Sequence, residues 1–160
     1  NPDFTVGLNT SLQYKDWDFV ANGYGAYGGK IYDNTSNAMF FQSALTNGNN
    51  VPSSVLNNGE AATGNSNSPS TRFLQSGDFF RLANIQLGYT LKGGNKVFGS
   101  WLKSMRLYVT GSNLFVITPY KGFDPEVNSN KTINGIPSSG MDYASYPKSR
   151  AFTFGINVNL

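Results

Sequence analysis

Three carboxylates in the last quarter of the chain are candidates for binding a metal ion or for acid–base catalysis. Asp124-Pro125-Glu126 and Asp142 could together offer oxygen ligands to a calcium ion, because hard cations prefer oxygen donors. They could also serve as a glycosidase acid and base, but nothing in the sequence sets their separation or raises a pKa. The alternative is a rigid loop in which Pro125 fixes a turn beside solvated carboxylates. We favour the loop and expect no metal site.

Histidine and cysteine are both absent from the sequence. The commonest general base and the commonest metal ligand are therefore missing, and so are thiolate sites and disulfides. The 12 basic and 9 acidic residues leave a net charge of +3, and the basic residues are scattered along the chain. We therefore expect no enzyme activity, no cofactor and no nucleic-acid partner.

The alternation of apolar and polar side chains along the sequence predicts five β-strands, on which any functional residue would be positioned. Strands are expected over residues 3–14, 17–27, 79–91, 104–116 and 151–160. The alternation is strict in the last strand, where one face carries Phe152, Phe154, Ile156, Val158 and Leu160. A tilted strand of about ten residues spans a bilayer, with its apolar face toward lipid and its polar face toward a wet lumen. A soluble β-sandwich fits this strand equally well.

The lengths of the connections favour a membrane barrel over a sandwich. Residues 15–16 and 92–103 are short connections, whereas 28–78 and 117–150 are long. Outer-membrane barrels alternate short periplasmic turns with long extracellular loops in this way. Within the first long loop we expect a short helix over residues 38–45, capped by Ser36 or Asn37.

Aromatic residues gather at the ends of the expected strands, as in the interfacial girdles of membrane barrels. The expected girdle residues are Tyr14, Trp17, Tyr89 and Trp101. Arg81 shares the apolar parity of its strand, and near the strand's start its long side chain can reach the interface.

The composition agrees with a barrel wall. Charged residues make up only 13%, aromatic residues reach 14%, and the mean hydropathy is −0.33. No run of 18 apolar residues is present, so no transmembrane helix is expected. Five strands cannot close a barrel, since the smallest has about eight. We therefore expect further strands from a longer polypeptide or from another chain.

Several ordered motifs resemble SusC/RagA-type TonB-linked outer-membrane proteins. The first is the run from Ser76 to Leu91, SGDFFRLANIQLGYTL. The second is MRLYVTGSNLF from Met105 to Phe115, followed by YKGFDPEV from Tyr120 to Val127. The ending, with Gly140-Met141-Asp142, Tyr146-Pro147 and the last strand, is similar to that of the family as well.

This resemblance implies an all-β fold, in which residues 1–160 are the C-terminal five strands of a transmembrane, antiparallel up-and-down β-barrel. The barrel would have 22 strands and a plug domain that is absent from this chain. The implied function is active import of oligosaccharides or peptides across the bacterial outer membrane. The implied partners are a SusD-like surface lipoprotein, the remaining strands and plug, outer-membrane lipid, and TonB-ExbB-ExbD acting through the absent N-terminal part. The C-terminus would lie in the periplasm.

Within such a barrel, two groups of residues are candidates for binding. Arg106 and Tyr108 share the polar parity of their strand and are expected to face the lumen and the plug. Loop residues could contact substrate or the partner lipoprotein, or could hold the loop together, and the residues alone leave these roles open. The loop candidates are Tyr120, Phe123, Asp124, Glu126, Tyr143 and Tyr146.

Two other functions remain open on the residues alone. One is a passive porin or structural barrel without TonB coupling. The other is a soluble carbohydrate-binding β-sandwich.

Overall fold

The computed structural model describes residues 1–160 except 47, 58–68, 94–100, 128–131, 134–135 and 138–139. The chain divides into two compact units. The sheet unit consists of Phe4–Tyr27, Phe79–Thr118 and Lys148–Leu160, and the loop unit consists of Asn1–Asp3, Gly28–Asp78 and Pro119–Pro147.

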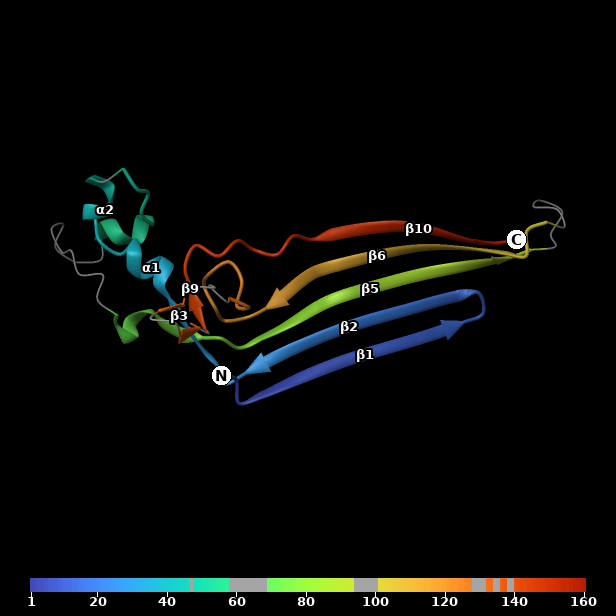
Figure 1. Ribbon diagram of the computed structural model, residues 1–160, viewed down its shortest axis with the longest axis horizontal. Coiled ribbons are helices and arrows are strands. Elements are labelled where there is room, and N and C mark those ends of the chain that lie inside the picture. The colour runs from blue at the N-terminus through green and yellow to red at the C-terminus, as the bar shows by residue number, and fades with distance from the viewer. Residues whose placement is uncertain (47, 58–68, 94–100, 128–131, 134–135, 138–139) are drawn as a thin grey trace. The chain divides into compact units, whose positions relative to one another are not determined.

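The sheet unit is one antiparallel sheet of long strands. They lie side by side in the order in which the chain visits them (Figure 1). The strands are β1 (Phe4–Tyr14), β2 (Trp17–Tyr27), β5 (Phe79–Lys92), β6 (Ser104–Ile117) and β10 (Ala151–Asn159). Their ends differ from the ranges expected from the sequence by at most one residue. The tight turn at Lys15-Asp16 forms because Lys15 adopts a positive φ of 55°, which lets Tyr14 pair directly with Trp17.

The register of the strand pairs places residues of the same face directly opposite one another. Side chains on neighbouring strands therefore form rows that cross the whole sheet. One row of directly opposed residues is Leu12, Phe19, Leu87, Val109 and Phe154. The adjacent row, on the opposite face, is Gln13, Asp18, Gly88, Tyr108 and Gly155. We call the side of the first row the apolar face and the side of the second row the polar face.

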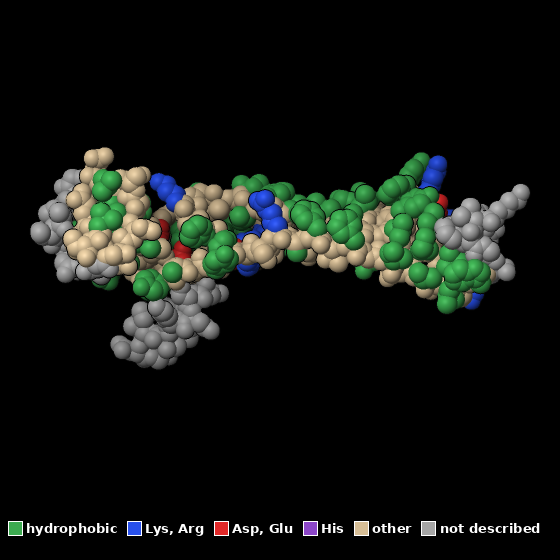
Figure 2. All heavy atoms as spheres, turned by 90° about the horizontal axis from the view of Figure 1, so that it is seen from above, with side chains coloured by type: hydrophobic (Ala, Val, Ile, Leu, Met, Phe, Trp, Pro, Cys, Tyr) green, Lys and Arg blue, Asp and Glu red, His purple; other side chains and the backbone are tan. Residues whose placement is uncertain are grey.

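The apolar face is uncovered. Leu87 and Leu107 lie on the interior strands β5 and β6, yet they remain 42% and 39% exposed. Each has strand neighbours on both sides, so the exposure means that no second layer formed by the described residues packs on them. Figure 2, which looks onto the edge of the sheet, shows exposed hydrophobic side chains along the strands. A β-sandwich would cover this face with a second sheet, so the structure disfavours the sandwich.

One expectation about the sheet is wrong. Arg81 was expected on the apolar parity of its strand, but the pairing of β5 with β2 shifts register between Asn22 and Gly23. The extra residue reverses the alternation beyond that point, as a β-bulge does. Arg81 therefore opposes Tyr24 on the polar face, where it is only 3% exposed.

The loop unit is built around a small sheet in the order β4-β3-β9. Its elements are β3 (Lys30–Asp33), α1 (Asn34–Ala38), α2 (Ser43–Thr46), the 3₁₀ helices Ser53–Asn57 and Thr71–Phe73, β4 (Leu74–Ser76), β7 (Thr132–Ile133), β8 (Ile136–Pro137) and β9 (Met141–Asp142). The single helix expected over residues 38–45 is wrong. The first helix ends at Ala38, and its N-cap is Asp33, whose carboxylate accepts from Ser36 N. No helix in the described ranges is long and apolar enough to cross a membrane.

A buried tyrosine and buried carboxylates hold the loop unit together. Tyr120 packs with Ile31 and Val127 and donates its hydroxyl to Asp142 Oδ2 at 2.5 Å. Asp142 pairs with Asp33 where β9 runs parallel to β3. Gln75 Nε2 donates to Asp33 at 2.9 Å. These bonds join three distant segments of the loop unit.

Burial raises the pKa of Tyr120, and the hydrogen bond to the Asp142 carboxylate raises it further. The neutral phenol is thus the form that the folded loop unit favours. The resulting stabilisation is fully present below the ordinary tyrosine pKa of about 10 and is lost as the pH rises through the higher pKa of the folded state.

We predict that Tyr120→Phe loosens the loop unit at neutral pH. The substitution removes a donor from a buried carboxylate, which typically costs about 1–3 kcal/mol. Hydrogen exchange in the native polypeptide should therefore speed up by about fivefold or more at the Tyr32 amide, which donates to Gly140 O. Tyr146→Phe is the matched control, because Tyr146 is 93% exposed. Equal exchange in the two variants would contradict a structural role for Tyr120.

Candidate functional site

Charged and aromatic side chains meet on the polar face in a group that we call the polar-face cluster: Asp18, Arg106 and Tyr108. Arg106 Nε donates to Asp18 Oδ1 at 2.9 Å, and Nη2 donates to Oδ2 at 2.5 Å. The guanidinium also lies over the Tyr108 ring, 5.0 Å from its centroid. Asp18 is on β2 and Arg106 on β6, so the ion pair reaches across the intervening strand β5.

Two glycines make this reach possible. Gly88 on β5 lies between Asp18 and Tyr108 in the same row, and a Cβ at Gly88 would collide with the Asp18 carboxylate and the Arg106 guanidinium. Gly155 on β10 directly opposes Tyr108, and a Cβ there would collide with the tyrosine ring. The Asp18–Arg106 pair therefore lies over the backbone of Gly88, and the Tyr108 ring lies over the backbone of Gly155.

The polar-face cluster is suited to bracing the sheet and to binding. Both charged side chains are about one quarter exposed, and a bidentate arginine–carboxylate pair is stronger than an ordinary surface ion pair. The pair is neutral overall. Among the described residues, no three acidic, histidine or cysteine side chains form a group that could hold a metal ion. The arrangement offers no nucleophile with an adjacent base.

Aromatic side chains form a row across the apolar face at the end of the sheet with the Lys15-Asp16 turn. Tyr14 opposes Trp17, and Trp17 opposes Tyr89 with ring centroids 4.6 Å apart. Trp101, the fourth expected girdle residue, is exposed in the connection that precedes β6. At the other end of the sheet, Phe4 stacks on Tyr27 with centroids 5.2 Å apart. This second pair was not among the girdle residues expected from the sequence.

The loop candidates separate into buried and exposed residues. Tyr120 and Asp124 are buried, so their side chains bind within the loop unit instead of at its surface; Asp124 Oδ1 accepts from Glu126 N at 2.9 Å. Asp142, the third carboxylate of the calcium hypothesis, accepts from Tyr120. Glu126 is half-buried, whereas Phe123, Tyr143 and Tyr146 are exposed. Only the exposed aromatic residues can meet a large ligand or a partner without rearrangement.

Asp18 is the member of the polar-face cluster that could not be predicted from the sequence. It stands directly after Trp17 at the start of a strand whose alternation is irregular, and its partner is 88 residues away. The only available signal was that the Asp18 carboxylate faces a glycine, Gly88, on the neighbouring strand. This signal can be recognised only when the register between the two strands is known.

Comparisons with known proteins agree with this geometry. No family model matches the chain. TonB-dependent receptor P3 of Formosa agariphila is 32% identical over 169 residues, which cover 98% of this chain and 16% of the relative. TonB-dependent receptor SusC of Bacteroides thetaiotaomicron is 30% identical over 159 residues, which cover 98% of this chain and 15% of SusC. The chain thus spans about a sixth of the length of these relatives.

Solved structures show the same fold. The RagAB peptide importer in its closed-closed state matches 99% of this chain with a TM-score of 0.75 and 23% identity, over 17% of the importer chain. Its open-open state matches the whole chain with a TM-score of 0.66 and 22% identity. The open antiparallel sheet is similar to part of the RagAB barrel. Together with the relatives that match over nearly the whole chain, this likeness shows that the chain resembles a segment of the SusC/RagA-type TonB-dependent receptors.

Proposed function

We propose that this chain is part of the wall of a 22-stranded, plugged barrel that actively imports oligosaccharides or peptides across the bacterial outer membrane. The observation that carries the proposal is a single sheet with an uncovered apolar face and an opposite polar face. Within the described residues, β1 pairs only with β2 and β10 pairs only with β6. Further strands on both edges would close the sheet into a barrel and remove its unpaired edges.

The spacing of the two aromatic groups supports a membrane position for the apolar face. Phe4 and Tyr14 lie at opposite ends of the eleven-residue strand β1. Their separation along the strand is about 34 Å at about 3.4 Å per residue. A tilt of about 45° reduces this to about 24 Å across the membrane, close to the roughly 25 Å apolar band of transmembrane barrels.

Orientation follows from the lengths of the connections. The Lys15-Asp16 turn and the connection before β6 would lie in the periplasm, and the C-terminus with them. The loop unit would then lie on the extracellular side. In this orientation Phe123, Tyr143 and Tyr146 are available to a substrate or to a SusD-like lipoprotein, which would cover the barrel as a lid.

The polar face would line the lumen. Arg106 and Tyr108 would then meet the plug domain, and Asp18 would hold the guanidinium in place for that contact. Energy would come from TonB-ExbB-ExbD through a part of the receptor outside this chain, so the residues of the wall need no catalytic chemistry. RagAB is a peptide importer, and its similarity to this chain supports peptides as one substrate class.

We predict that uptake through the full-length receptor requires TonB. Bacteria in which this receptor is the sole importer for a tested oligosaccharide or oligopeptide should lose that uptake when the tonB gene is deleted. The matched control is a diffusive porin substrate, whose uptake should be unaffected. Persistent uptake without TonB would favour the passive porin, and recovery of the native polypeptide in the detergent-free soluble fraction would favour a soluble binding protein.

We also predict that the two faces of β6 have different neighbours. Benzoylphenylalanine placed at Tyr108, on the polar face, should cross-link within the receptor to its plug domain. The same photoreactive residue at Leu107, on the apolar face, should cross-link to lipid and not to the plug. Peptide mapping by mass spectrometry reads out both products. Plug adducts from position 107, or none from position 108, would contradict the assigned faces.

A further inference from the structure

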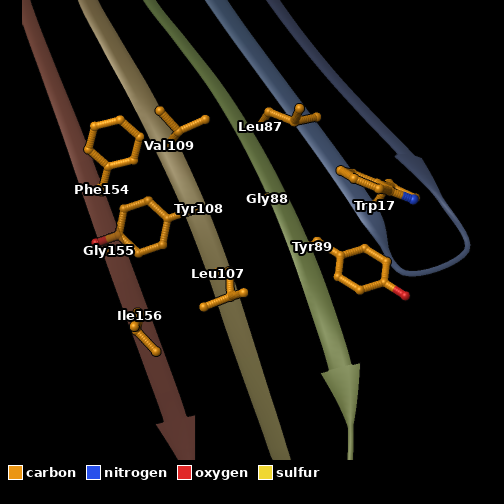
Figure 3. A pocket seen from close by; sticks show the side chains of 10 residues that line it. All are labelled: Trp17, Leu87, Gly88, Tyr89, Leu107, Tyr108, Val109, Phe154, Gly155 and Ile156. Atoms are coloured by element: carbon orange, nitrogen blue, oxygen red, sulfur yellow. The ribbon is translucent and has the colours of Figure 1, made fainter.

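The apolar face is hollowed at one place. A groove of about 520 Å³ crosses β5, β6 and β10 near the row of aromatic residues (Figure 3). Tyr89 and Trp17 stand on one side of it and Phe154 stands on the other, whereas the shorter side chains of Leu107 and Val109 lie between them. Differences in side-chain length on one sheet face therefore create a trough along β6, which we call the β6 groove.

The lining of the β6 groove selects an apolar ligand. Its side chains are aromatic or aliphatic, and none of them is charged. The charged residues of this part of the sheet, Asp18 and Arg106, are paired with each other on the opposite face. A peptide or a sugar would leave its polar groups without partners in such a groove, whereas a hydrocarbon chain would not.

The side of the groove formed by Trp17 and Tyr89 carries polar atoms. In Figure 3 the indole nitrogen of Trp17 and the hydroxyl oxygen of Tyr89 lie at the outer ends of their side chains, away from Leu107 and Val109. Tryptophan and tyrosine take this amphipathic role at a membrane interface, with the ring in the apolar layer and the N–H or O–H at the polar layer. The two groups are hydrogen-bond donors that fit the ester or phosphate oxygens of a lipid.

We infer that the β6 groove is a binding site for one phospholipid, whose acyl chain lies over Leu107 and Val109 and whose ester and phosphate oxygens meet Trp17 and Tyr89. The inference rests on the proposed function, which places the apolar face in the bilayer, and it goes further by assigning one held lipid to one groove. The rest of the apolar face would meet only exchanging lipid.

Photolabelling of the full-length receptor tests this site. The receptor is reconstituted in vesicles of phosphatidylethanolamine and phosphatidylglycerol that contain a trace of phosphatidylethanolamine with a diazirine in its acyl chain. After illumination, peptide mapping should find the label concentrated on residues 107–109 and 154–156. Val109→Phe fills the groove and should abolish that label. Leu12→Phe, which also introduces a phenylalanine on the apolar face but outside the groove, should leave it unchanged.

The outcomes separate the site from the proposed function. Label spread evenly over the apolar face, with no effect of Val109→Phe, would overturn the phospholipid site and leave the barrel intact. No label anywhere on the apolar face would overturn the membrane position itself. Heat-modifiable migration in gels checks that the variants are folded, and Leu107→Phe replaces Val109→Phe if the latter does not fold. Trp17→Phe should weaken retention of the label without filling the groove.

Discussion

Backbone hydrogen bonding in a medium without water is the constraint that would govern the proposed membrane-spanning sheet. Inside hydrocarbon, each peptide N–H and C=O must find a partner in the protein, and a sheet meets this demand only when every strand has neighbours on both sides. The interior strands β2, β5 and β6 satisfy it within the chain. In the proposed barrel, β1 and β10 would each pair with a further strand. The same pairing fixes register, and register places Leu12, Phe19, Leu87, Val109 and Phe154 in one row facing one way.

On the polar face, glycine residues leave the space in which larger polar side chains contact one another. A sheet of uniformly large side chains would keep Asp18 and Arg106 apart, since a whole strand separates them. Gly88 leaves the gap through which they meet, and Gly155 leaves the gap over which Tyr108 lies. The two charges are thereby neutralised on the face that would line the lumen of the proposed barrel. The apolar face gains its groove in a related way, because short aliphatic side chains stand between aromatic ones.

The strands could be predicted from the sequence because side-chain alternation is a local property. Phe152 to Val158 reveal their strand without any knowledge of their neighbours. Contacts between distant strands could not be predicted in the same way. The pairing of Asp18 with Arg106 depends on register across β5, and the burial of Arg81 depends on a bulge that shifts that register. In the loop unit, the helix expected after Asn37 begins earlier because Asp33 caps it. Tyr120 is buried among segments far apart in the sequence, which no local pattern reveals.

Accessibility along β10 tests most directly whether the apolar face meets lipid. Spin labels placed one at a time from Phe152 to Val158 in the full-length receptor, reconstituted in vesicles, report collisions with oxygen in the bilayer and with a water-soluble nickel complex. A barrel wall predicts high oxygen access at Phe152, Phe154, Ile156 and Val158, with low oxygen access at the residues between them. An absence of this two-residue period, or equal access of the nickel complex at all positions, would contradict a membrane-spanning sheet.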